Sequence, residues 1–246
     1  MFKNLFLTLF ILSFFPTFAH DNKIILLSEA MEPFIKDNSG KLSGPFIEAF
    51  LKIATENKIE LEFQKVPIRR ALKDIEKLNN HCVFAANYSP ETSETLLYVS
   101  RLSEIKIWAY SLKQRNININ NIKNLNKYKI GAIDIAEVRD ILSLNSIQYT
   151  PIFRSASAMQ MLLSNRFDIL IGDINLELLN KQDTKKIKQN IPIITVEKWL
   201  ICNHNLSQQI VKKLKTAYVY GLFAPNTKEI WKKYDMIKFY NANKVE

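Results

Sequence analysis

Residues suited to metal binding or nucleophilic catalysis are few in this chain and lie far apart. The three histidines are His20, His81 and His204, and no C-x-x-C pair accompanies them. Structural zinc sites usually combine such ligands at short spacing, so no metal site is predicted. The five glycines do not form a G-x-G-x-x-G or G-x-x-x-x-G-K-[ST] phosphate-binding loop. We therefore predict no cofactor and assign no catalytic residue.

Residues 1–19, MFKNLFLTLFILSFFPTFA, have the pattern of a secretory signal peptide. A lysine precedes an apolar run, and small residues precede a cleavage site that we place after Ala19. A membrane anchor is the alternative, but the apolar run is shorter than the ~20 residues of a spanning helix and Pro16 interrupts it. No cysteine follows the cleavage site, as a lipid-anchored protein would require. We expect a periplasmic protein that is soluble once the signal is removed.

The chain is basic, with a formal net charge of +10. Such a charge can indicate binding to nucleic acid or to an anionic membrane surface. Here the lysines are dispersed, and their densest cluster, NKQDTKKIKQN at 180–190, lacks interleaved aromatic residues and is typical of a solvated helix end. Nucleic-acid binding is therefore not predicted.

The elements that would position a site alternate between strand and helix. Continuous apolar runs predict strands at 22–30, 59–67 and 81–88, and helical spacing predicts helices at 45–58 and 68–80. The same alternation begins again near residue 104 and continues to about residue 174. Alternating strands and helices favour a parallel sheet with crossover helices. A chain of 246 residues is long enough for two such α/β units.

Several segments, in this order, resemble the type 2 periplasmic solute-binding proteins that serve polar amino-acid ABC transporters, known as family 3. They are MEPFIKDNSGKLSGPFIEAFLKIA, VPIRRALKDI, SPETSETLLYVS, NLNKYKIGAI, SASAMQMLLSNRFDILIGD and IVKKLKTAY with TKEIWKKY. The resemblance implies two α/β lobes joined by two crossing strands, with lobe 1 at 20–105 plus 198–246 and lobe 2 at 106–197. It also implies a monomer that binds a small solute in the cleft between the lobes, with an ABC permease as a possible partner.

The resemblance also assigns ligand-binding residues. On the first lobe these are Glu32, Phe34, Asn87, Tyr88 and Ser89, and on the second lobe Asp173, which would pair with a ligand ammonium. Asp173 could alternatively cap a helix N-terminus. Members of the family place an arginine after the SPE turn to bind the ligand carboxylate. Thr92 stands at that position, or Ser93 if the alignment shifts by one residue, and neither is cationic.

Two interpretations of the missing arginine remain open. Another cation could replace it, and Arg69, Arg70 and Arg101 are the candidates. Alternatively, the ligand is not an α-amino acid. In the second lobe, Asp134 stands where the family often has Gly-Thr, which also removes a carboxylate-binding feature.

Binding, rather than catalysis, is the predicted activity. A few proteins of this fold are periplasmic dehydratases of cyclohexadienyl acids, so an enzyme of that kind is the alternative, with Glu32 or Asp173 as acid or base. An orphan ligand-sensing domain is a third possibility.

A disulfide between Cys82 and Cys202 is a further implication of the resemblance. In the family the strands that carry these positions are antiparallel neighbours in the first lobe. The start of one strand would therefore meet the end of the other, at a separation that a disulfide tolerates. Two buried free thiols are the alternative.

Overall fold

A computed structural model describes residues 23–153, 155–173 and 181–244 of the chain. The predicted signal peptide at 1–19 and its cleavage site lie outside these residues. Within the described part, no helix is long and apolar enough to cross a membrane.

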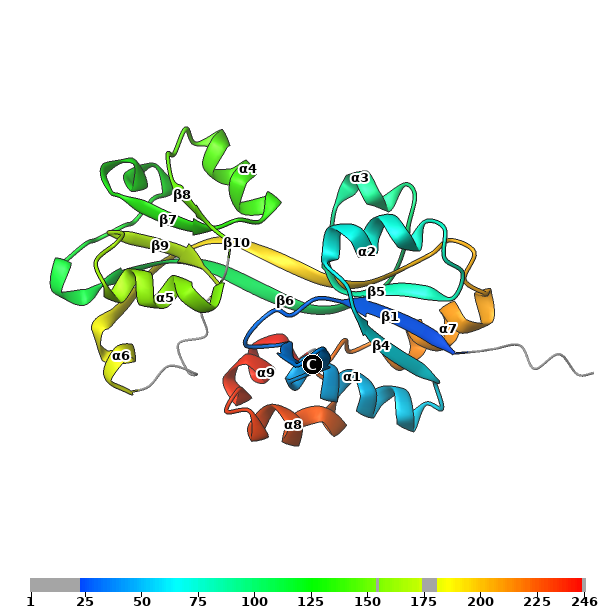
Figure 1. The fold of residues 1–246 in the computed structure, drawn as a ribbon. Helices are drawn as coiled ribbons and strands as arrows, with labels where there is room; N and C mark the ends of the chain where they lie inside the picture. Colours follow the sequence, from blue (N-terminus) through cyan, green and yellow to red (C-terminus); the bar gives the residue numbers. More distant parts are fainter. Residues whose placement is uncertain (1–22, 154, 174–180, 245–246) are drawn as a thin grey trace, which may run out of the picture.

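The structure has two α/β lobes that share one eight-stranded sheet (Figure 1). The strand order is β4-β1-β5-β10-β6-β9-β7-β8. The strands are β1 (Ile24–Ser28), β4 (Leu61–Lys65), β5 (His81–Asn87), β6 (Leu97–Leu112), β7 (Ile130–Ile133), β8 (Thr150–Ile152), β9 (Ile169–Gly172) and β10 (Ile187–Cys202). A separate hairpin consists of β2 (Lys36–Asn38) and β3 (Lys41–Ser43).

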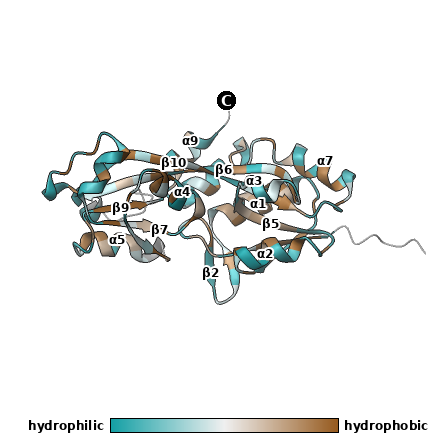
Figure 2. Cartoon of the chain, turned by 90° about the horizontal axis from the view of Figure 1, so that it is seen from above, coloured by the Kyte–Doolittle hydropathy of each residue, from teal (hydrophilic) through white to brown (hydrophobic). Residues whose placement is uncertain are grey.

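The helices are short and cover the sheet on both sides (Figure 1). They are α1 (Pro45–Glu56), α2 (Ile68–Ile75), α3 (Pro90–Ser93), α4 (Ala136–Leu144), α5 (Ser155–Leu163), α6 (Lys181–Lys186), α7 (Gln208–Ala217), α8 (Lys228–Lys233) and α9 (Ile237–Asn243). Figure 2 shows hydrophobic residues along β5 and β9, and hydrophilic residues on β2 and much of α2. This distribution is expected for buried strands and partly solvated outer elements.

The first lobe is built on parallel pairing of β1 with β4 and β5. Helix α1 packs there with the predicted face, because Phe46, Ala49, Phe50 and Ile53 are all buried. The C-terminal helices return to this lobe: Trp231 on α8 lies 5.8 Å from Phe46, measured between ring centroids. Aromatic contacts therefore hold helices α1 and α8 in one core.

The second lobe repeats the arrangement with β7 paired in parallel to β8 and β9. The predicted parallel pairing is thus found in the outer part of each lobe. The centre of the sheet differs, because β5, β10, β6 and β9 pair antiparallel. The reason is that β6 leaves the first lobe and β10 returns to it, so the two strands must run in opposite directions.

The crossing strands β6 and β10 are each 16 residues long and pair from Ile187 opposite Leu112 to Cys202 opposite Leu97. Their register shifts near Pro192 and again between Lys198 and Trp199. Such bulges bend a strand and change the direction of its side chains. We call the part of β6 and β10 where they pass between the lobes the hinge.

A disulfide joins Cys82 on β5 to Cys202 on β10, which confirms the predicted bond. The two residues face each other in the antiparallel ladder, with their Cα atoms 4.0 Å apart, and both are fully buried. The bond therefore ties the returning crossing strand to the first lobe.

Candidate ligand-binding site

A cavity of about 510 Å³ opens at the hinge. It is lined by Tyr88, Glu104, Glu137, Thr195, Val196 and Glu197. Tyr88 follows β5 in the first lobe, Glu137 lies in the first turn of α4 in the second lobe, and the others lie on the two crossing strands. Both lobes and the hinge therefore contribute to the walls of this cavity, whose size is typical of small-molecule sites.

A chain of hydrogen bonds beside the cavity links the two lobes. The Lys198 Nζ on β10 donates to Asn87 Oδ1 at 2.6 Å, and Asn87 Nδ2 donates to Glu137 Oε2 at 3.1 Å. Asn87 ends β5 in the first lobe, whereas Glu137 belongs to the second. One amide side chain thus connects a crossing-strand lysine to a carboxylate of the opposite lobe.

Lys198 and Asp173 perturb each other through their charges. Burial lowers the pKa of the Lys198 ammonium, and the carboxylates of Asp173, Glu137 and Glu29 act in the opposite direction. Burial also raises the pKa of the Asp173 carboxyl, and the charge of Lys198 opposes this rise. The cation is therefore held among several carboxylates near the end of β9.

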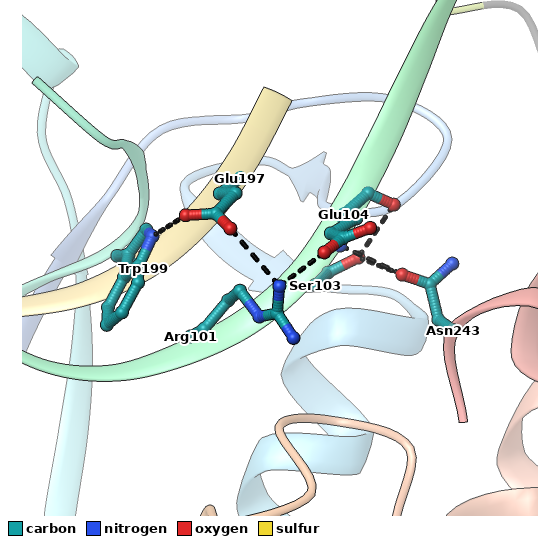
Figure 3. Close-up of polar contacts among 6 residues, drawn as sticks. All are labelled: Arg101, Ser103, Glu104, Glu197, Trp199 and Asn243. Carbon is teal, nitrogen blue, oxygen red and sulfur yellow. Dashed lines mark hydrogen bonds and ion pairs between the residues drawn. The ribbon is translucent and has the colours of Figure 1, made fainter. Parts of the chain in front are cut away.

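A second ionic cluster joins the two crossing strands at the hinge (Figure 3). Arg101 on β6 donates to Glu104 and, at 3.1 Å, to Glu197 Oε1 on β10. The Trp199 Nε1 donates to the other oxygen of Glu197 at 2.9 Å. Asn243, at the end of α9, accepts the backbone N–H of Glu104 at 2.8 Å. Arg101 is thus already shared by two carboxylates.

Aromatic rings form the first-lobe side of the site. Tyr88 and Tyr98 are 5.1 Å apart between ring centroids, and Tyr98 and Trp199 are 5.7 Å apart. Tyr88 is 44% exposed and lines the cavity, and its backbone N–H is held by the carbonyl of Glu197 at 3.2 Å. The backbone of Tyr88 is therefore held by β10, and its ring is an accessible surface for a ligand.

The Tyr98 hydroxyl organises the loop after β5. It accepts the backbone N–H of Ser89 at 3.0 Å and lies 2.6 Å from Thr92 Oγ1. The side chain of Thr92, at the position of the family arginine, is therefore engaged within its own loop.

We predict that Tyr98→Phe lowers the free energy of unfolding by about 1 kcal/mol, because the polar groups of Ser89 and Thr92 lose their partner. Urea unfolding measures the change. The matched control is Tyr220→Phe, whose ring is 46% exposed, and equal midpoints for the two variants would contradict the prediction.

The structure brings together three of the residues predicted to bind a ligand. Tyr88 lines the cavity, Asn87 lies in the hydrogen-bond chain beside it, and Asp173 interacts with Lys198. Ser89 and Thr92 lie in the adjacent loop, bonded to Tyr98.

The other predicted residues lie elsewhere. Phe34 was predicted to line the cleft, but it is 1% exposed and packs 4.8 Å from Phe46 in the first-lobe core, so its ring has no surface for a ligand. Glu32 lies in an exposed turn, and Arg69 is exposed on α2. Arg70 is also exposed and lies 3.4 Å from Asp74 on the same helix. Neither Arg69 nor Arg70 is among the residues that line the cavity.

Sequence reasoning missed the charged residues on β10 and at the start of α4. Glu197 and Lys198 interrupt the otherwise apolar segment ITVEKWLIC, and charged residues inside a central strand need a partner or a function. That pattern could have marked the segment. Asp134, by contrast, forms an ion pair with Arg139 at 2.6 Å, which also raises the pKa of Arg139.

Comparisons with known proteins define the fold. No family model and no curated protein sequence matches the chain. Among solved structures, the GluR0 ligand-binding core in complex with L-glutamate superposes with a TM-score of 0.70 at 12% identity, covering 86% of this chain and 97% of that one. An ancestral arginine-binding protein bound to arginine superposes with a TM-score of 0.66 at 19% identity, covering 87% of this chain and 98% of that one. A histidine kinase sensor domain with similarity to periplasmic binding proteins superposes with a TM-score of 0.65 at 11% identity, covering 91% of this chain and 96% of that one.

These likenesses establish the architecture. The chain has the two-lobed α/β fold of the periplasmic binding proteins, as the sequence resemblance predicted. The identities are too low to carry over a ligand from any of these structures.

Proposed function

We propose that the protein is an extracytoplasmic solute-binding protein that captures a small polar solute in the cavity at the hinge. The observation that carries this proposal is the composition of the cavity wall, to which Tyr88 of the first lobe, Glu137 of the second and Glu197 of a crossing strand all contribute. A solute bound there contacts both lobes at once. It would therefore favour the closed arrangement of a two-lobed protein over the open one.

The solute-binding role is supported by neighbours of the same fold. They include a putative L-cystine ABC transporter from Listeria monocytogenes and an arginine transport-system periplasmic binding protein from Legionella pneumophila. We propose that this chain, exported by its N-terminal segment, acts in the same way as a monomer and delivers its solute to an ABC importer.

We further propose that binding, not catalysis, is the activity. The cyclohexadienyl acids of the alternative carry carboxylates, and within residues 23–153, 155–173 and 181–244 the side chains that line the cavity include three glutamates and no basic group. A substrate of that charge would be repelled from the site.

The proposal predicts that a thermal-shift screen of small metabolites finds at least one stabilising solute. A ligand at 100 times its dissociation constant adds about 2.7 kcal/mol to the stability of the folded protein. The same screen should show no turnover of the stabilising compound by mass spectrometry. Conversion of the compound to a product would identify an enzyme instead, and a screen of broad chemistry without any stabilising solute would contradict the binding function.

A further inference from the structure

The cavity at the hinge has a charge that opposes the charge of the whole chain. The protein has 34 lysines and arginines against 24 aspartates and glutamates, whereas the lining residues that the structure describes include Glu104, Glu137 and Glu197 and no basic side chain. The acidic wall is therefore a local feature of the site and not a consequence of composition.

Two cations beside this wall, Arg101 and Lys198, are already matched by carboxylates. Arg101 is shared by Glu104 and Glu197, as Figure 3 shows. Lys198 is bonded to Asn87 and interacts with the charges of Asp173, Glu137 and Glu29. In the described part of the site, five carboxylates thus surround two cations. Neither of these two cations is left over for a ligand carboxylate, and Thr92 supplies none from the neighbouring loop. Lys106 pairs across the crossing strands with the lining residue Thr195, but it is exposed and is not among the described residues that line the cavity.

Closure of the lobes would make this imbalance costly. Carboxylates that are removed from water need a counter-charge or hydrogen-bond donors, and the wall does not supply enough of them. A positively charged ligand provides both. A ligand carboxylate would instead add to the excess of negative charge.

An independent feature of the site favours the same ligand. The ring of Tyr88 is exposed to the cavity at the edge of an aromatic cluster with Tyr98 and Trp199. A cation over an aromatic face is attracted by the ring quadrupole, most strongly where water is excluded. Carboxylates and an aromatic face together form a site for an ammonium or guanidinium group.

We infer that the ligand is a small organic cation that carries one or two ammonium or guanidinium groups and lacks a carboxylate. This inference rests on the proposed binding function and narrows it to one class of solute. Glu137, which approaches from the second lobe, and Tyr88, which approaches from the first, are its principal contacts.

Three probes with the same five-carbon chain test the inference by isothermal titration calorimetry. They are 1,5-diaminopentane, L-lysine, which is the same diamine with one carboxylate added, and glutarate, a dicarboxylate of five carbons in all. We expect the diamine to bind, lysine to bind at least tenfold more weakly, and glutarate not to bind at millimolar concentration. Glu137→Gln should weaken diamine binding by tenfold or more, whereas Glu229→Gln, in an exposed ion pair on α8, should not change it.

Other outcomes overturn the inference. Binding of lysine or glutarate as tight as that of the diamine would show that the site accepts a carboxylate. Diamine binding that is unaffected by Glu137→Gln would place the amine elsewhere, and a diamine that does not bind at millimolar concentration would contradict the inference. None of these results removes the proposed function, which is lost only if the broad metabolite screen is also negative.

Discussion

Loss of the Cys82–Cys202 disulfide is expected to produce the largest change in stability of any substitution outside the aromatic core. The bond joins residues 120 positions apart, and the chain-entropy model gives about 4–5 kcal/mol for a loop of this length. Because both cysteines are buried opposite each other in β5 and β10, a Cys82→Ala/Cys202→Ala variant also leaves small gaps in the packing. We therefore predict that the free energy of unfolding falls by about 4 kcal/mol in the double variant, as measured by guanidinium unfolding.

Chemical reduction provides the matched control. A reducing agent should destabilise the native protein by a similar amount and leave the double variant unchanged, since the variant has no bond to reduce. Solute binding should survive at temperatures where the variant is folded, because the disulfide lies within the first lobe and leaves the second lobe free to move. Equal stability of the oxidised and reduced native protein would contradict the expected contribution of the bond.

Replacement of Lys198 by methionine is expected to have the second largest effect. The substitution keeps the aliphatic bulk of the side chain but leaves Asp173 and Glu137 without the cation that lies among them. Removing one partner of a fully buried charge pair costs about 3 kcal/mol or more, because the remaining charge is uncompensated. Lys198 and Asp173 are only partly buried, so we predict that the free energy of unfolding falls by less than this, by about 1–2 kcal/mol at neutral pH.

The pH dependence of this loss identifies its cause. Burial already raises the pKa of Asp173, and Lys198 limits the rise, so the pKa should be higher still in Lys198→Met. A carboxyl whose pKa is raised on folding binds its proton more tightly in the folded state, so its unfavourable contribution grows as the pH rises through that pKa. The difference in free energy of unfolding between the native protein and Lys198→Met should therefore become smaller as the pH falls from neutral to acidic.

A second substitution controls for lost packing. Lys198→Met/Asp173→Asn removes both charges and should recover part of the stability lost in the single variant. Unfolding midpoints at several pH values compare the two variants. If the free energy of unfolding is lowered by the same amount at every pH, and equally in the single and double variants, Lys198 acts through packing alone.

The sequence predicted those features that depend on local patterns. The buried face of α1 follows from the spacing of Phe46, Phe50 and Ile53, and the outer strands follow from their apolar runs. The antiparallel centre of the sheet depends on where the chain leaves and re-enters the first lobe. It is therefore visible only in the family resemblance, which also gave the disulfide.

The charged part of the site could not be predicted in the same way. Asn87 contacts Glu137, 50 positions further along the chain, and Lys198, which is 111 positions away. These residues meet only because β10 returns beside β5, a consequence of tertiary structure that no local periodicity encodes. The burial of Phe34 has a related cause, since its ring contacts Phe46 and also Phe239, which lies about 200 positions further along the chain.

The central claim is that a small solute binds between the two lobes, in contact with both. It is tested most directly by calorimetric titration of the solute found by the metabolite screen into three variants: Tyr88→Ala in the first lobe, Glu137→Gln in the second, and the control Glu229→Gln. Each of the two site variants should weaken binding at least tenfold, because each removes a contact from a different wall of the cavity, and the control should bind as the native protein does. If binding depends on Tyr88 or Glu137 alone, or on neither, the solute does not bridge the lobes at this cavity and the account is wrong.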